Sequence, residues 1–470
     1  MTAADAPAVR GATSLDGRTF TFTAGGGRYV AGSMVLLHGT GVSALGQVTS
    51  SPSPAGSGRD RAPGEGVVVA AVGDDDVPVR REVPPFADAR LDAVPPAVLE
   101  SLQLSVGATL PVGVWRSGPS DVVARLRAGG FNRHTFLCGQ SGSGKTYALG
   151  VLLEQLLLAT DLRLVVLDPN ADFVRLGELR QDAPAPASTR LGPGAVRVLR
   201  AAGAGGEPLR LRFATMPPRA QAAVLQLDPV ADRAEYNQFL HTMATFRAHS
   251  VTELAATLQA GSPDERALGQ RLENLGMEEW EVWAAENPSA AEVVDAHARA
   301  TVLDLGGFRD PLEPLAVSLD VLEDLWGRRA RRVPTLIVVD EAHNLCAAEP
   351  TSALQERVTA RLVQIAAEGR KYGLWLLLST QRPSKIHPQV LSQCDNLALM
   401  RMNSRADLEE LAKVFGFVPR AMLQAAPHYV QGEMLLAGAF APVPSRVRVG
   451  ARLTFEGGGD VPVPMWDPHG

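Results

Sequence analysis

The sequence predicts an α/β fold in which a small N-terminal β-barrel precedes a parallel sheet and an all-α insertion interrupts the sheet domain. Short apolar segments alternate with helical patterns over residues 134–167 and again over 301–379, which is typical of a doubly wound parallel sheet. Before residue 115, β-branched and polar residues alternate between clusters of Gly, Pro and Ser, which favours a small barrel or sandwich.

Composition and charge limit the class of protein. The 470 residues are 46% hydrophobic and 20% charged, enough for roughly two to four domains with a core. The net charge of −6 excludes a uniformly basic surface, so any contact with nucleic acid must come from a local basic patch. The three scattered cysteines suit a reducing compartment. Neither a signal peptide nor an apolar run of about 20 residues is visible, so we expect a cytoplasmic protein without a membrane span.

We assign residues 1–115 to the barrel. A helix is expected near its end, over 96–103, and a Ser/Pro/Gly-rich flexible loop over 50–64. The expected strands of the barrel cover residues 19–23, 29–30, 34–37, 45–48 and 66–72.

A glycine-rich loop follows a predicted strand at 134–138 and precedes a predicted helix at 147–158. Its glycines let consecutive N–H groups point at a phosphate, and the helix N-terminus adds positive potential. Lys145 would reach the β- and γ-phosphates of ATP, and the Thr146 hydroxyl would bind Mg²⁺. Only four of the 45 basic residues are lysines, so a lysine here indicates a need for a compact charge. The proposed phosphate-binding residues are Gly139, Gln140, Ser141, Gly142, Ser143, Gly144, Lys145 and Thr146.

The rest of the chain divides into an ATPase core, 116–215 and 301–445, around an all-α insertion at 216–300, with a tail at 446–470. A strand is expected at 162–167 and a hairpin around 196–199. Helices of the insertion are expected at 220–227, 235–248, 251–258, 264–275 and 290–298. Strands are then expected at 301–305, 336–341, 374–379 and 446–455, and helices at 314–328 and 352–371.

A second motif consists of four apolar residues followed by Asp340 and Glu341. A carboxylate at the end of a buried strand beside the phosphate loop can hold Mg²⁺ through water, which is the role we expect for Asp340. Glu341 can polarise the attacking water as general base. An acidic cap between a strand and a helix would look alike, but together with the phosphate loop the pair indicates ATP hydrolysis.

Three further polar residues follow predicted elements of the sheet. Gln381 is placed to sense the γ-phosphate, unless it simply belongs to a polar loop. Asp168 could orient water or metal, and could equally cap the following turn. Arg370 either complements the dipole of the preceding helix on a solvated face or serves as an arginine finger for an adjacent subunit. The second alternative requires an assembly, most simply a ring.

These motifs together resemble the HerA family within the HerA/FtsK ATPases, and the resemblance extends over nearly the whole chain. The Asp-Glu-Ala-His string alone would suggest many helicases. Two blocks distinguish the HerA family from them: 368–373 (Glu-Gly-Arg-Lys-Tyr-Gly) and 379–384 (Ser-Thr-Gln-Arg-Pro-Ser). The resemblance implies a RecA-like P-loop NTPase core and a homo-hexameric motor that threads double-stranded DNA. It implies a partner, either a NurA-like nuclease in DNA end processing or an effector in antiphage defence.

The resemblance also implies roles for single residues. Thr146 and Asp340 bind the metal, Glu341 is the catalytic carboxylate, and Gln381 is the sensor. Arg370 is the trans finger, with Arg382 as a rival. The tail resembles a segment that folds over a nucleotide site.

Four cations on loops that leave the sheet are candidates for tracking DNA phosphates, although each could be an ordinary solvated side chain. They are Arg175, Arg180, Arg382 and Lys385. Two other functions stay open: a conjugation- or secretion-type motor, and a ring scaffold that assembles and gates a partner nuclease with hydrolysis secondary.

Overall fold

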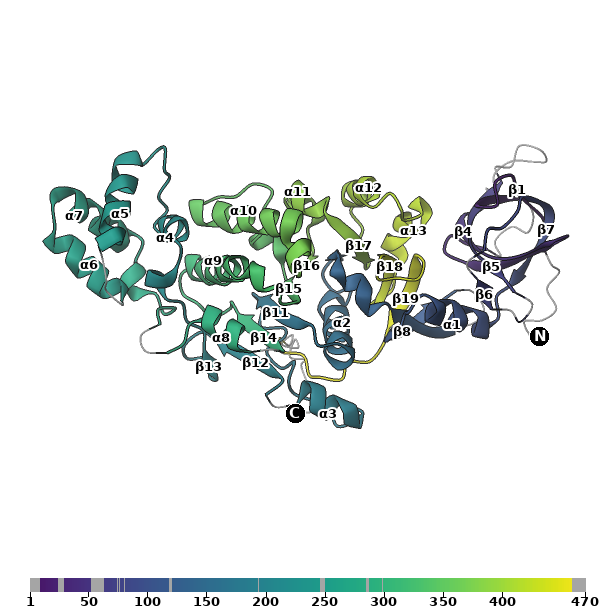
Figure 1. Cartoon of the computed structure of the whole chain (residues 1–470), viewed down its shortest axis with the longest axis horizontal. Helices are drawn as coiled ribbons and strands as arrows, with labels where there is room; N and C mark the ends of the chain where they lie inside the picture. Colours follow the sequence, from purple (N-terminus) through teal and green to yellow (C-terminus); the bar gives the residue numbers. More distant parts are fainter. Residues whose placement is uncertain are drawn as a thin grey trace, which may run out of the picture. The chain divides into compact units, whose positions relative to one another are not determined.

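The computed structural model describes residues 9–23, 29–51, 63–73, 75, 77–79, 81–117, 121–192, 194–245, 250–284, 287–297 and 299–458. Most of the expected flexible loop and the end of the tail lie outside these residues. The chain forms two units: the first comprises Met1–Thr160, Ala342–Glu349 and Val363–Ala451, and the second comprises Asp161–Glu341, Pro350–Leu362 and Arg452–Gly470. Figure 1 labels the helices and strands of both.

The first unit begins with a closed antiparallel barrel, as predicted (Figure 1). Its strands lie in the order β2-β1-β7-β3-β4-β5, and β5 pairs with β2 to close it. Phe20 fills the interior, and Gly66 is required beside it because a Cβ there would lie 2.1 Å from the ring. The strands are β1 (Val9–Ser14), β2 (Thr19–Phe22), β3 (Met34–Gly39), β4 (Val42–Ser50), β5 (Gly64–Val72) and β7 (Phe86–Ala93), with β6 (Pro78–Val79) alongside β5.

The remaining strands of the first unit form the sheet that carries the phosphate loop. Helix α1 (Pro96–Ser105) precedes them. Strands β16, β10 and β17 are parallel neighbours, and β18, β19, β8 and β9 continue the order with antiparallel pairing. They span β8 (Leu110–Arg116), β9 (Asp121–Leu126), β10 (His134–Cys138), β16 (Leu374–Thr380), β17 (Cys394–Leu399), β18 (Glu433–Gly438) and β19 (Ser445–Val449). The helices are α2 (Lys145–Ala159), α11 (Pro388–Leu391), α12 (Arg405–Val414) and α13 (Arg420–Gln424).

The second unit contains a parallel set of strands in the order β13-β12-β14-β11-β15. The hairpin predicted around 196–199 is wrong, because β12 pairs in parallel with β14, which follows it by about 100 residues. A local pattern cannot reveal a partner beyond a long insertion. The strands are β11 (Arg163–Asp168), β12 (Val196–Arg200), β13 (Glu207–Pro208), β14 (Ala300–Asp304) and β15 (Thr335–Val339).

The predicted insertion is helical and lies between β13 and β14. Figure 1 shows α5, α6 and α7 gathered together. Two of its helices begin with capping boxes, Ser262 with Glu265 and Ser289 with Glu292, which satisfy the first N–H groups of each helix. The helices are α4 (Pro218–Val224), α5 (Arg233–Thr245), α6 (Val251–Ala260), α7 (Pro263–Asn274) and α8 (Ala290–Ala296). Outside the insertion are α3 (Ala185–Leu191), α9 (Leu312–Gly327) and α10 (Ala353–Glu368).

Long apolar helices are absent from the described ranges: none there has the length and hydropathy needed to cross a membrane.

Helix α9 carries a buried carboxylate, Asp320, whose side chain is 6% exposed. Its Oδ2 has no hydrogen-bond partner among the described residues. Burial raises the pKa of Asp320 to about 7, and the charges of Asp324 and Glu292 act in the same direction, while Arg328 opposes them. In the unfolded chain the same carboxyl titrates near pH ~4. The folded state therefore binds this proton more tightly, and the stability of the fold falls as the pH rises from about 4 to about 7.

Replacement of Asp320 by Asn should remove this pH-dependent penalty, because the amide stays neutral. We expect Asp320→Asn to raise the thermal unfolding midpoint at pH 8 by roughly 2–4 °C or more and to change it less at pH 5. Calorimetry at both pH values measures this, with Glu273→Gln on the exposed surface of α7 as the control. An equal shift at both pH values would mean that packing, and not the charge, is responsible.

Candidate nucleotide-binding site

The predicted phosphate loop, 139–146, connects β10 to α2 as expected from the sequence. Gly142 and Gly144 have φ angles of 71° and 92°, in the left-handed region that glycine adopts without strain. The loop is held from outside, since Gln140 N donates to Arg401 O at 2.9 Å and Gly432 N donates to Ser143 O at 2.9 Å. The result is a fixed turn that leads into the N-terminus of a 15-residue helix, an arrangement suited to a phosphate group.

Lys145, the first residue of α2, has a side chain that is only 5% exposed. Its Nζ donates to Ser379 Oγ at 3.0 Å. Ser379 lies in β16, directly beside Leu137 of β10 in the parallel register. The ammonium group is therefore held at the carboxyl end of two neighbouring strands, close to the loop that precedes it. Thr146 follows on the same helix and is half-buried.

Arg401 also contacts the phosphate loop, a contact that was not predicted. Its Nη2 lies 3.4 Å from Gly142 O. The residue follows β17, and β17 pairs in parallel with β10 on the side opposite β16. Because strand β17 itself was not predicted, no local signal placed Arg401 near the loop.

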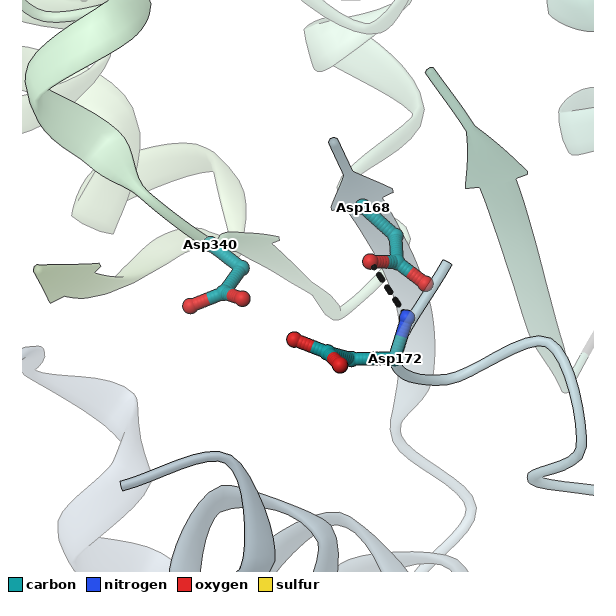
Figure 2. A group of neighbouring side chains, drawn as sticks. All are labelled: Asp168, Asp172 and Asp340. Atoms are coloured by element: carbon teal, nitrogen blue, oxygen red, sulfur yellow. Dashed lines mark hydrogen bonds between the residues drawn. The ribbon is translucent and has the colours of Figure 1, made fainter. Parts of the chain in front are cut away.

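A group of three carboxylates lies in the second unit: Asp168 at the end of β11, Asp172 in the following turn and Asp340 after β15 (Figure 2). One carboxylate oxygen from each lies within 4.8 Å of the others. Oxygen ligands of this type suit a divalent cation such as Mg²⁺. Asp340 was predicted as a metal ligand, whereas Asp172 was not, although it follows a strand end by only four residues.

Asp168 caps the turn that brings Asp172 beside it. Its Oδ1 accepts the N–H of Asp172 at 3.0 Å, and its Oδ2 accepts the N–H of Phe173 at 2.8 Å. Burial raises the pKa of Asp168 to about 7, against the effect of these two hydrogen bonds and with a contribution from the charge of Asp340. Asp168 thus caps the turn and also places a carboxylate oxygen in the acidic group, so the structure is compatible with both alternatives from the sequence.

Glu341 has a left-handed backbone with φ of 42°, which is costly for a residue with a side chain. The residue before it is fixed, because Asp340 N donates to Leu167 O at 3.1 Å. The buried Glu341 side chain therefore stands where the strand ends and the 3₁₀ turn η6 (Ala342–Asn344) begins. Such strain is characteristic of functional positions.

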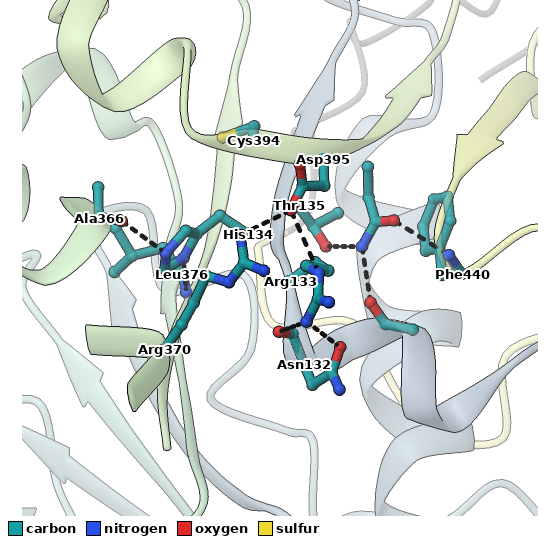
Figure 3. Close-up of polar contacts among 12 residues, drawn as sticks. Asn132, Arg133, His134, Thr135, Ala366, Arg370, Leu376, Cys394, Asp395 and Phe440 are labelled. Carbon is teal, nitrogen blue, oxygen red and sulfur yellow. Dashed lines mark hydrogen bonds and ion pairs between the residues drawn. The ribbon is translucent and has the colours of Figure 1, made fainter. Parts of the chain in front are cut away.

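Arg370 lies in the 3₁₀ turn η7 (Gly369–Tyr372) of the first unit, and its side chain is 38% exposed. Its Nη1 donates to Asp395 Oδ2 at 3.0 Å (Figure 3). Arg133 Nε lies 3.4 Å from the same oxygen. One carboxylate thus holds two guanidinium groups at an open surface, which is compatible with either interpretation of Arg370.

A buried polar network underlies this surface (Figure 3). His134 Nδ1 accepts the N–H of Leu376 at 2.9 Å, so its Nε2 carries the proton and donates to Ala366 O at 3.0 Å. Burial lowers the pKa of His134 to about 4, which keeps the ring neutral. Asn396 Nδ2 donates to Thr135 Oγ1 at 3.0 Å. These bonds tie the strand before the phosphate loop to its two neighbours.

The predicted sensor and cations are distributed over both units. Gln381, Arg382 and Lys385 follow β16 in the first unit and are exposed. Arg175 and Arg180 lie in the second unit, where both contact the tail. The guanidinium of Arg175 lies 4.5 Å from the centre of the Phe455 ring, and Arg180 Nε donates to Thr454 O at 3.2 Å.

The described part of the tail therefore packs inside the second unit, along the segment after β11. Leu179 and Thr454 form an antiparallel bridge, and Gly457 N donates to Asp172 O at 3.0 Å. A Cβ on Gly457 would lie 1.9 Å from Ala171 O, so only glycine fits this approach. The tail supports the turn that carries Asp172.

A parallel strand that runs into a glycine-rich loop, a buried lysine at the start of the next helix and a strand that ends in Asp-Glu define a P-loop ATPase. Residues 114–307 match the family model described as "Helicase HerA, central domain". The match over those residues confirms the resemblance to HerA-type ATPases inferred from the motifs.

Curated relatives match over part of their length. The probable DNA double-strand break repair helicase HerA of Methanocaldococcus jannaschii is 30% identical over 128 residues, which is 27% of this chain and 25% of that protein. The DNA double-strand break repair helicase HerA of Sulfurisphaera tokodaii is 25% identical over 171 residues, 34% of each protein. The matched stretch thus spans about a quarter to a third of these relatives.

Among solved structures, VirB4 of Thermoanaerobacter pseudethanolicus aligns with a TM-score of 0.48 and 17% identity, over 73% of this chain and 97% of that chain. The plasmid coupling protein TrwB in complex with GDPNP aligns with a TM-score of 0.47 and 15% identity, over 69% and 87%.

Removal of the Lys145 ammonium should weaken nucleotide binding, because a charge-assisted contact to phosphate is lost. We expect Lys145→Ala to raise the Kd of a fluorescent ATP analogue roughly 10- to 100-fold in a titration with Mg²⁺. Lys413→Ala, at a lysine that is 75% exposed, is the matched control and should bind normally. Equal affinities of the two variants would exclude the loop as the nucleotide site.

Proposed function

We propose that this chain is the subunit of a hexameric, ATP-driven translocase that moves along double-stranded DNA and works with a partner nuclease or a defence effector in the cytoplasm. The observation that carries the proposal is that the stretch matching the HerA central domain contains a formed phosphate loop with its lysine buried and held by Ser379. The three free cysteines are buried thiols, which suits a reducing compartment.

The proposed chemistry assigns one task to each group. The N–H groups of residues 139–146 and the ammonium of Lys145 bind the triphosphate of ATP. Thr146 and Asp340 hold Mg²⁺, with Asp172 as an additional oxygen ligand near Asp340. When bound, Mg²⁺ neutralises charge that develops on the phosphate oxygens.

Glu341 accepts a proton from the attacking water as general base, a contribution of about 10²–10⁴-fold in rate. Gln381, directly after β16, senses the γ-phosphate. Asp168 acts indirectly by holding the Asp172 turn in place.

Arg370 is proposed to complete the site of the adjacent subunit. Two observations support it: the guanidinium is partly exposed, and its partner Asp395 is a surface carboxylate that a phosphate group could replace. An exposed ion pair contributes only about 0–1 kcal/mol, so such an exchange would cost little. Arg382, exposed on the loop after β16, is the alternative finger.

A finger acting in trans predicts complementation. Arg370→Ala should bind ATP and lose about 10³-fold or more of its turnover, and Glu341→Gln should behave alike because it lacks the general base. In mixed rings, an Arg370→Ala subunit keeps Glu341 and receives Arg370 from a Glu341→Gln neighbour, so a phosphate-release assay should show partial recovery. Absence of recovery in rings shown to be mixed would point to Arg382 or to a role within one chain.

Duplex DNA as cargo predicts a salt-sensitive stimulation. Linear duplex DNA should raise the ATP turnover, and the effect should shrink as salt rises because phosphate contacts release counterions. The double variant Arg382→Ala/Lys385→Ala should reduce the salt slope of DNA binding by about 2. Arg175→Ala is the control, since Arg175 pairs with Glu178 and stacks on Phe455.

If DNA leaves turnover unchanged at low salt, also in the presence of the partner, the cargo assignment is wrong. The scaffold and the secretion-type motor would then take its place.

A further inference from the structure

Two segments far apart in the sequence lie against each other in the first unit. The first, 342–348, follows Glu341, and the second, 380–387, carries Gln381, Arg382 and Lys385. Ala348 N donates to Lys385 O at 2.8 Å, and His387 N donates to Cys346 O at 3.0 Å. Ala347 and Ile386 form an antiparallel bridge between these two bonds. We call the paired segments the coupled loop.

Thr380 connects the coupled loop to the phosphate loop. The residue ends β16 and is completely buried. Its carbonyl oxygen accepts the N–H of Gly139, the first residue of the phosphate loop, at 3.3 Å. Its Oγ1 accepts the N–H of Arg382 at 3.0 Å and lies 3.1 Å from Nδ1 of His343. One side chain therefore joins both halves of the coupled loop, while its backbone joins the phosphate loop.

We propose that Thr380 and His343 are positioning residues that transmit the state of the nucleotide to Arg382 and Lys385 in the coupled loop. The segment 342–348 begins directly after Glu341, so a shift of Glu341 on ATP binding displaces that segment. The hydrogen bonds of the coupled loop then carry Arg382 and Lys385 along. This inference rests on the proposed function for the identity of the cargo, although the link between nucleotide and loop does not depend on DNA.

The hydroxyl of Thr380 is the part of this link that a substitution can remove cleanly. Thr380→Val keeps the shape and the backbone bond to Gly139 and loses only the contacts to Arg382 and His343. Thr380→Ser keeps the hydroxyl and is the matched control. His343→Ala removes the other partner at a half-buried position, so it tests the same link if the valine variant folds poorly.

The first experiment measures ATP turnover of full-length rings with and without linear duplex DNA. Basal turnover should stay within about twofold in Thr380→Val and His343→Ala, while the DNA-dependent increase should fall about fivefold or more. The double variant should lose no more than either single variant, because both remove one link. An unchanged DNA-dependent increase overturns the inference, and so does an equal loss of basal and stimulated turnover, which marks a merely structural role.

The second experiment separates this inference from the proposed function, because it needs no DNA. A non-hydrolysable ATP analogue should slow amide hydrogen exchange over residues 382–387 in the wild type and in Thr380→Ser, and have little effect in Thr380→Val. If the analogue protects Thr380→Val equally, or protects no variant, the inference is wrong. If the expected pattern appears but DNA stimulates none of the proteins, the inference stands and the DNA cargo does not.

Discussion

The hydrogen bonds that tie the start of the phosphate loop to the ends of two neighbouring strands fix the part of the first unit in which Lys145, Ser379 and Gln381 lie. Gly139 N donates to Thr380 O, Met400 N donates to Cys138 O, and Gln140 N donates to Arg401 O. Because parallel strands end at one edge, these bonds bring Ser379 to Lys145 without any contribution from chain proximity. Backbone hydrogen bonds between the strands thus set where the side chains of the site lie.

Local signals in the sequence were enough for much of the fold. Hydrophobic periodicity, the placement of glycines and helix caps act within a few residues. They predict the strand before Gly139, helix α2, the barrel and the helices of the insertion. Strands β17 and β18 were not predicted: each is almost wholly buried, so polar alternation is missing, and the parallel partner of β17 is β10, far away in the sequence. For the same reason Asp395, within β17, and Arg401, just after it, were not expected at their sites. Asp172 was missed because the sequence does not show that the turn after β11 folds back onto the end of that strand.

The count of basic residues in the sequence overstates the charge that is open to a polyanion. Glu323 is buried and pairs with the buried Arg361 and the half-buried Arg357, and the tail contacts Arg175 and Arg180. Arg382 and Lys385 differ from these, since they lie exposed on a loop whose backbone is tied to the segment after Glu341. Sequence identifies cations, whereas only the fold distinguishes structural cations from those that face solvent.

The polar network under Arg370 has a consequence for how the chain assembles its sheet. Strands β10, β16 and β17 are rich in Leu, and such apolar side chains would pack almost equally well if one strand slipped by a residue. A slip would leave the imidazole of His134 and the carboxamide of Asn396 without hydrogen-bond partners in an apolar interior. Burying polar groups without such partners costs free energy of folding. These two side chains therefore favour the native strand register over registers shifted by one residue when the distant strands of the sheet pair during folding.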